Sequence, residues 1–114
     1  MRRLFPVVLL AALAGCAGGQ RGACGAAEAV VENASSLAVE QLYLTSATGA
    51  DWGSDLLGQS PALPAAGRMP LAFGGPGPWR LRLVWVNGRA IELGGIDGCR
   101  TRRIILRDDM LTAN

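Results

Sequence analysis

Residues 79–93, WRLRLVWVNGRAIEL, decide the fold. Apolar side chains alternate with other side chains from Trp79 to Val86, and a period of two is typical of a strand with one buried face. Asn87-Gly88 follows as a hairpin signal, and residues 89–93 form the returning strand. This stretch therefore predicts an antiparallel hairpin at the centre of a β domain.

Two loop lengths compete for this hairpin. A two-residue loop pairs Val86 with Arg89 and mixes charged with apolar side chains on both faces. A three-residue loop pairs Trp85 with Arg89, and Gly88 then supplies the left-handed residue of a type I turn with a bulge. Because a one-residue slip turns every side chain over, the buried face decides the register. We predict the three-residue loop, with Leu83 opposite Ile91, Leu81 opposite Leu93 and Arg82 opposite Glu92, the four apolar residues facing the core.

Outward from the hairpin, other short apolar runs are separated by Gly, Pro and Asn-Ser turns. They cover residues 29–32, 37–45, 68–73 and 101–107. We expect an all-β domain, a small antiparallel β-sandwich (immunoglobulin-like or similar) of five to seven short strands, with a small barrel as the alternative. The domain boundaries are 28–108 for the sandwich and 109–114 for a frayed tail.

The segment 51–63, DWGSDLLGQSPAL, is too broken by Gly and Pro for a strand. Asp51 or Ser54 is placed to cap a single helical turn over residues 55–57. Trp52 and the two leucines of that turn would then plug one end of the sandwich. Trp52, Trp79 and Trp85 fit either a ligand pocket or the core; we favour the core, with Trp79 the one that reaches the surface.

Composition excludes several classes of function. The 11 basic residues are all Arg, and the chain has no Lys and no His. Without Arg2 and Arg3, nine Arg face nine acids, which argues against a nucleic-acid binder because such proteins need a basic excess. The absence of His and Lys also removes the usual general bases and imidazole metal ligands. We expect no enzyme, no cofactor and no metal site.

The first residues read as an export signal. Arg2 and Arg3 precede an apolar run from Leu4 to Ala14, which is too short to span a bilayer and fits the central region of a secretory leader. Leu13-Ala14-Gly15-Cys16 follows, and these residues resemble the lipobox of a bacterial lipoprotein. An ordinary secretory signal or a buried N-terminal helix are the alternatives.

The lipoprotein resemblance implies that a helical signal peptide, 1–15, is removed and that Cys16 is acylated. Acyl chains on Cys16 then anchor the protein to a membrane. Ala17 stands where the family carries Asp for inner-membrane retention, so in a host with two membranes the protein faces the periplasm from the outer membrane. Residues 16–27, rich in Gly and Ala, form the lipidated Cys and a flexible tether.

Cysteine number supports an exported protein. The chain has three Cys, and acylation of Cys16 leaves Cys24 and Cys99. In an oxidising compartment a Cys24–Cys99 disulfide is the simplest outcome, with two free thiols as the alternative.

A second resemblance covers Val30 to Leu106. Asn33-Ala34-Ser35-Ser36, the Trp52 to Gly58 segment, the central strand and the late Cys99 are similar to a group of small exported bacterial domains with no established activity. This chain lacks the Cys that the group carries before the central strand, so Cys24 is the partner available to Cys99.

Three constellations remain as candidate sites. Asp51 and Asp55 are closely spaced acids in the broken segment, and they suggest either a hydrolase or a Ca²⁺ site, although a structural loop fits them better. Arg100, Arg102 and Arg103 form a basic cluster that suits lipid headgroups, peptidoglycan acids or an acidic partner, or simply a solvated edge strand. Trp79 is a further binding candidate, beside these three arginines.

Together these signals predict a lipid-anchored envelope protein that acts as a non-catalytic binding or scaffolding module. The alternatives are an accessory subunit or inhibitor that docks a larger envelope complex through a sheet edge, and a hydrolase that uses Asp51 and Asp55.

Overall fold

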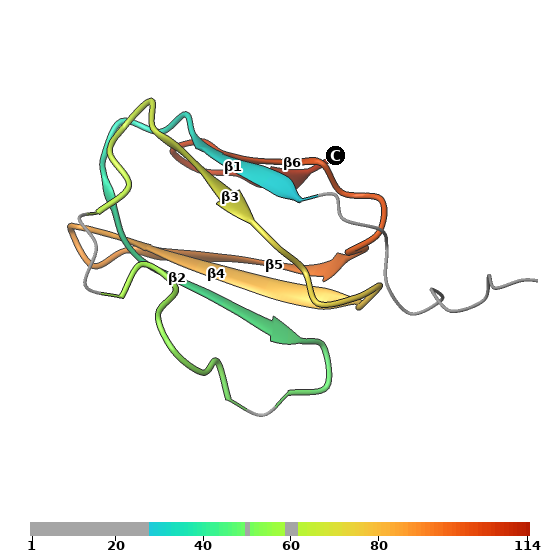
Figure 1. Cartoon of the computed structure of the whole chain (residues 1–114). Helices are drawn as coiled ribbons and strands as arrows, with labels where there is room; N and C mark the ends of the chain where they lie inside the picture. The colour runs from blue at the N-terminus through green and yellow to red at the C-terminus, as the bar shows by residue number, and fades with distance from the viewer. Residues whose placement is uncertain (1–27, 50, 59–61) are drawn as a thin grey trace, which may run out of the picture.

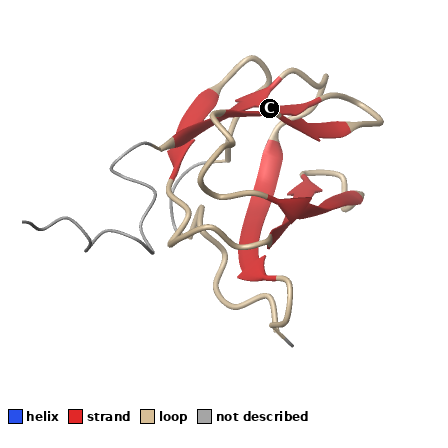
Figure 2. Cartoon of the chain, turned by 90° about the vertical axis from the view of Figure 1, so that its right-hand side faces the viewer, coloured by secondary structure: helices blue, strands red, loops and turns tan. Residues whose placement is uncertain are grey.

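The computed structural model describes residues 28–49, 51–58 and 62–114. These residues form strands and loops with no helix, arranged as two packed sheets (Figures 1 and 2). The prediction of a small β-sandwich is confirmed. The predicted signal-peptide helix lies outside the described residues.

Seven strands make the sandwich. They are β1 (Ala29–Asn33), β2 (Val39–Ser46), β3 (Arg68–Leu71), β4 (Trp79–Trp85), β5 (Ala90–Ile96), β6 (Arg103–Leu106) and β7 (Leu111–Ala113). Each of the short apolar runs seen in the sequence overlaps one of the first six strands.

One sheet has the strand order β3-β1-β6-β7 and the other has the order β2-β4-β5. Strands β1 and β6 pair in parallel, with Val30 opposite Arg103 and Asn33 opposite Leu106, whereas the other pairs are antiparallel. The sheet is therefore mixed rather than purely antiparallel. The reason is that both strands start at the same end of the sandwich, which the order of the runs along the sequence does not reveal.

The β4–β5 hairpin has the predicted three-residue loop. Leu81 lies opposite Leu93, Arg82 opposite Glu92 and Leu83 opposite Ile91. In the turn, Gly88 N donates to Trp85 O at 2.8 Å, and Gly88 has a φ of 90°. Arg82 Nη1 reaches Glu92 Oε2 at 2.6 Å, and the Arg89 guanidinium carbon lies 4.6 Å from the centre of the Trp85 ring.

The core lies between the facing sides of the two sheets. Leu81 and Leu83 on the central strand β4 are fully buried, while Ile91 and Leu93 are only half-buried because β5 is an edge strand. Trp85 is 1% exposed, so it belongs to the core as favoured from the sequence. Inward side chains of both sheets complete it, among them Val31, Leu42, Ile104 and Leu106.

A buried polar network joins the two sheets. Asn33, at the end of β1, is 0% exposed, and its amide nitrogen donates to Leu37 O at 2.9 Å and Leu63 O at 3.1 Å. Its Oδ1 accepts hydrogen bonds from the Ser35 backbone N–H and from the Ser35 hydroxyl. Trp85 Nε1, in the opposite sheet, donates to that hydroxyl oxygen at 2.9 Å. Every polar atom of the Asn33 side chain is thus paired, as burial requires.

The predicted frayed tail at 109–114 is wrong. Residues 111–113 form β7, which pairs with β6, and Leu111 is buried against the core. Asp108 and Asp109 form the turn of this hairpin, closed by a hydrogen bond from Arg107 N to Met110 O at 2.8 Å. A strand of three residues is too short to show a period in the sequence.

The predicted helical turn over residues 55–57 is also wrong. The described part of that segment has no helix, and it runs along the open edge of β2, where Leu56 N donates to Leu42 O at 2.7 Å. Leu57 is buried, as expected for a plug, but Leu56 is 48% exposed and Trp52 lies half-buried on the outside of the sheet. Hydrogen bonding to the exposed edge of β2 therefore determines the conformation of this segment, and helix capping does not.

The network around Asn33 yields a stability prediction. Asn33→Ala removes the amide bonds to the carbonyls of Leu37 and Leu63 and leaves the buried Ser35 N–H without its partner, and we expect it to lower the free energy of unfolding by about 3 kcal/mol. Urea unfolding followed by circular dichroism measures the loss. The matched control is Asn87→Ala in the hairpin turn, where one exposed bond to Arg89 N is removed and we expect a loss of under about 1 kcal/mol. Equal losses for the two variants would contradict a stabilising role for the network.

Candidate functional site at the entry end

The sandwich has two distinct ends. The described chain enters at Glu28, and Val30 N donates to Arg102 O at 2.9 Å, so the start of β1 lies beside the loop that precedes β6 (Figure 1, right). We call this the entry end; it also carries the loops 72–78 and 97–102. The opposite turn end carries the loops 34–38, 86–89 and 107–110 (Figure 1, left).

The three predicted arginines do not form one patch. Arg100 is 86% exposed, and its Nε lies 3.9 Å from Asp97 Oδ2. Arg102 is exposed and its Nη1 donates to the carbonyls of Cys99 and Thr101. Arg103 points elsewhere, because Glu32 on the neighbouring strand holds it with two hydrogen bonds of 3.1 Å. The entry end thus presents Arg100 and Arg102, while Arg103 belongs to the outer face of its sheet.

Trp79 lies half-buried under the Gly-Pro loop at the entry end. Its Nε1 donates to Gly75 O at 2.9 Å, and its ring lies 6.1 Å from the ring of Phe73. Trp79 also lines a hollow of about 320 Å³ with Ser46, Thr48 and the 74–78 loop. Its partial exposure matches the prediction, but the indole N–H is occupied by its own loop.

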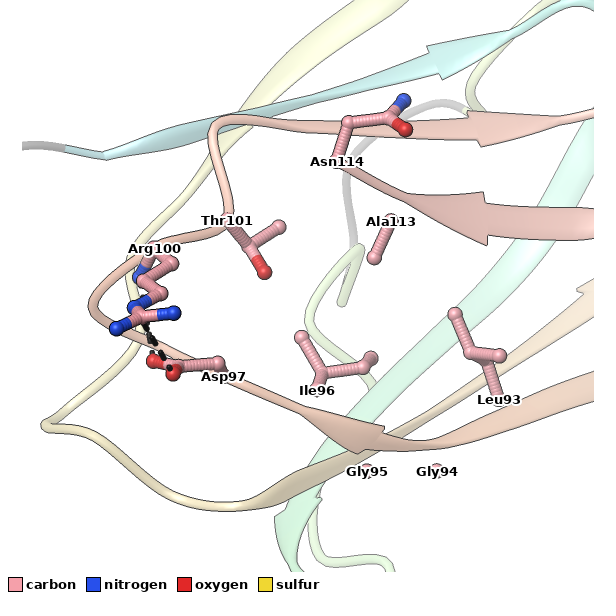
Figure 3. A pocket seen from close by; sticks show the side chains of 9 residues that line it. All are labelled: Leu93, Gly94, Gly95, Ile96, Asp97, Arg100, Thr101, Ala113 and Asn114. Carbon is pink, nitrogen blue, oxygen red and sulfur yellow. Dashed lines mark hydrogen bonds and ion pairs between the residues drawn. The ribbon is translucent and has the colours of Figure 1, made fainter.

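A second hollow, of about 340 Å³, opens between the edge strands β5 and β7 (Figure 3). Leu93, Ile96 and Ala113 supply its apolar sides, and the Asp97–Arg100 ion pair stands at its mouth. Gly94 and Gly95 leave one wall without side chains. Sequence reasoning missed this hollow because its walls come from strands of different sheets.

An ionic cluster crosses the outer face of the four-stranded sheet. Glu32 on β1 faces Arg103 on β6 and lies 3.8 Å from Arg68 on β3. The hydrogen bonds from Arg103 lower the pKa of the Glu32 carboxyl, and the charges of Arg103, Arg68 and Arg107 lower it further. The cluster ties three neighbouring strands together.

A second carboxylate closes the turn end. Asp108 Oδ1 accepts hydrogen bonds from the backbone N–H of Ser36 at 2.7 Å and from its hydroxyl at 2.8 Å. These two bonds lower the pKa of Asp108, and the nearby charge of Arg89 adds to the effect. Arg89 also donates to Asp108 O at 3.0 Å while it stacks on Trp85. The loops of both sheets are joined here.

The acid pair Asp51 and Asp55 has a structural explanation. Asp55 Oδ1 accepts the backbone N–H groups of Leu42 at 2.9 Å and Leu57 at 3.0 Å, and so fastens the 51–58 segment to the edge of β2. Asp51 is exposed. Across residues 28–49, 51–58 and 62–114, no three His, Cys, Asp or Glu side chains are grouped closely enough to hold a metal ion.

The structure brings together one pair that the sequence analysis did not single out. Arg80 on β4 stacks on Trp52, with the guanidinium carbon 4.5 Å from the ring centre. The signal was present in the alternation of β4, which sends Arg80 and Arg82 outward while Leu81 and Leu83 point inward. What the sequence did not give was the path of the 51–58 segment, which delivers Trp52 to that face.

The cysteine predictions fall mainly outside the described residues. Cys16 and Cys24 both lie there. Cys99 is half-buried in the turn before β6, and its backbone N–H donates to Asp97 Oδ1 at 2.8 Å. Acylation of Cys16 and the Cys24–Cys99 disulfide therefore stay predictions.

Comparison with known proteins adds no identity. No family model matches the chain, and neither a curated protein nor a solved structure is significantly similar to it. Within the described part of the chain, no helix is long and apolar enough to cross a membrane.

The lowered pKa values predict acid sensitivity. A carboxyl whose pKa is lower in the folded state stabilises the fold above its unfolded pKa and loses that contribution as pH falls through the folded pKa. For Glu32 and Asp108, with ordinary values of 4.5 and 3.8, the loss sets in as pH falls below these values. We expect Glu32→Gln to be less stable than wild type at pH 6 and to lose less stability between pH 6 and pH 3.

Urea midpoints measured across that pH range test the effect. Glu40→Gln is the control, because Glu40 is exposed and has no ion pair among the described residues, so we expect it to keep the wild-type acid dependence. An unchanged acid dependence in Glu32→Gln would contradict the role given to this carboxylate.

Proposed function

We propose that this protein is a lipid-anchored component of a bacterial cell envelope, whose β-sandwich acts as a non-catalytic binding or scaffolding module. The order of a positive start, an apolar run and Leu13-Ala14-Gly15 before Cys16 carries the proposal. Acylated Cys16 anchors the chain, residues 17–27 connect it to the sandwich, and in a host with two membranes the domain faces the periplasm from the outer membrane.

The geometry of the entry end supports this arrangement. Because β1 starts there, a tether that begins at Cys16 brings this end nearest to the membrane. Arg100 and Arg102 lie exposed at the same end, where their charge suits anionic headgroups. The turn end and the outer faces of the sheets are then left for partners.

A binding role fits the polar groups better than catalysis does. Asp55 is committed to two backbone N–H groups, Glu32 to two arginines and Asp108 to the Ser36 loop. The chain has no His or Lys to act as a base beside its serines. Asp55 Oδ1 already accepts the two bonds that fasten the 51–58 segment, and Asp51 lies exposed.

The strand register supports a Cys24–Cys99 disulfide. Strands β1 and β6 run in parallel, and Val30 lies opposite Arg103. Cys99 lies in the turn just before β6, so it is at the same end of the sandwich as the start of β1. A disulfide here would tie the tether to the entry end.

Docking to a larger envelope complex through a sheet edge is the second candidate. The segment 51–58 and Leu63 cover the edge of β2, whereas β5 borders the hollow beside β7. An incoming extended segment would find apolar Leu93 and Ile96 there, and Gly94-Gly95 would allow close backbone approach. Crosslinking in native membranes would separate the two roles by showing whether a partner contacts β5.

The anchor predicts a clear change in localisation. We expect Cys16→Ser to abolish acylation and to move the protein from the membrane fraction to the soluble fraction, because no acyl chain then holds it. Metabolic labelling with a fatty acid and fractionation measure the two effects. Ala17→Ser, which leaves Cys16 intact, is the control and should stay in the membrane. A Cys16→Ser protein that fractionates like wild type would refute the anchor.

The disulfide predicts a crosslinked peptide. We expect proteolysis of natively exported protein without reductant to yield one species that contains both Cys24 and Cys99. After reduction the two peptides should separate and each thiol should accept an alkylating reagent. Recovery of both cysteines alkylated before any reduction would contradict the pairing.

A further inference from the structure

Arg80 is a cation without an anionic partner. Arg82 pairs with Glu92, and Arg68 and Arg103 pair with Glu32, but no described carboxylate lies within ion-pair distance of Arg80. Its Nε is buried and has no hydrogen-bond partner. A polar atom shielded from water costs free energy unless it is paired, so such an atom in a folded protein calls for an explanation.

The Arg80 side chain is also held in place. Trp52 stacks on its guanidinium at 4.5 Å, and the side chain lies on β4, the central strand of the β2-β4-β5 sheet. Stacking fixes the plane of the guanidinium, and its two Nη groups, which are not buried as Nε is, remain as donors for another group. A positioned guanidinium matches the two oxygens of a carboxylate.

The face around Arg80 favours a sugar as the carrier of that carboxylate. Thr45 lies opposite Arg80 and Tyr43 opposite Arg82, so a hydroxyl and an aromatic ring lie on the same outer face as the guanidinium. Aromatic rings offer an apolar surface with a polar tip, which suits a sugar ring. An extended peptide would need a free strand edge, but both edges of β4 are filled by β2 and β5.

Charge argues against a nucleic acid on this face. Glu92 on β5 neutralises Arg82, so Arg80 supplies the only unpaired positive charge among the described outward residues of β4 and β5. A nucleic-acid backbone carries one phosphate for every nucleotide and binds through several cations. One free guanidinium fits an isolated carboxylate on a saccharide.

We propose that Arg80, positioned by Trp52 on the outer face of the β2-β4-β5 sheet, anchors a binding site for the carboxylate of an acidic glycan. The inference rests on the binding role proposed above but not on the lipid anchor. Its test therefore fails separately from that of Cys16→Ser, which reports only on membrane attachment.

The test measures binding of oligogalacturonate to the full chain in a non-ionic polyoxyethylene detergent by titration calorimetry. The methyl ester of the same oligosaccharide serves as the ligand control, because it lacks the negative charge. We expect the acid to bind and the ester to fail. Arg80→Ala should weaken binding at least about tenfold, since a charge-assisted bidentate pair is lost.

Two further variants keep the test decisive. Arg80→Lys retains the charge but not the planar fork, and it should also weaken binding severalfold or more while circular dichroism shows the native fold. Arg107→Ala removes an equal charge from an exposed position just after β6 and should leave the affinity within twofold of wild type. Absence of binding, equal effects of Arg80→Ala and Arg107→Ala, or tighter binding of poly-L-glutamate or a single-stranded oligonucleotide would each overturn the proposal.

Discussion

The hydrogen bond between Trp85 Nε1 and the Ser35 hydroxyl is the contact through which the two sheets depend on each other. The hydrophobic effect is non-directional, so a directed hydrogen bond helps to fix the position of one sheet relative to the other. The Asn33 amide fixes the position of that hydroxyl and at the same time holds Leu37 and Leu63. One buried side chain thus positions the end of β1, the start of β2 and the segment that precedes β3. A partly satisfied network would be costly, and here every donor of Asn33 is used.

The two ends of the sandwich differ in how their loops are connected to this contact. At the turn end, Arg89 on Trp85 and Asp108 on Ser36 extend the same connection to the surface. The loops there are fastened to one another by charges and backbone groups. At the entry end the loops are rich in Gly and Pro and surround hollows. The end of the sandwich that carries the Asn33 network is therefore opposite the end where β1 starts, and the two hollows lie at the latter end.

The sequence predicted what alternation and turn chemistry control. The pairing of Arg82 with Glu92 followed from keeping Leu81 and Leu83 on one face, and Gly88 followed from the turn that this pairing needs. The parallel pairing of β1 with β6 did not follow, because it joins residues about seventy positions apart that share no local pattern. Strand β7 has no recognisable pattern in the sequence, because Leu111 is its one buried side chain.

The candidate sites also divide into those that local sequence predicts and those that depend on contacts between distant segments. Trp79 was placed at the surface because it follows a Gly-Pro loop, and it is partly exposed there. Arg103 was grouped with Arg100 by proximity in sequence, but strand geometry sends it to Glu32. Arg80 acquires its special position only when the 51–58 segment brings Trp52 onto the sheet. Contacts between a strand and a distant irregular segment leave no periodic trace in either.

The proposed function rests on one covalent event, the acylation of Cys16, and on the position in which that anchor would hold the sandwich. The most direct measurement is the intact mass of the protein extracted from native membranes, recorded before and after reduction. The expected species begins at Cys16, carries the acyl chains of a mature lipoprotein, and gains two hydrogens when the Cys24–Cys99 bond is reduced. A species that retains residues 1–15, or begins at Cys16 without added acyl mass, would contradict this picture of the molecule.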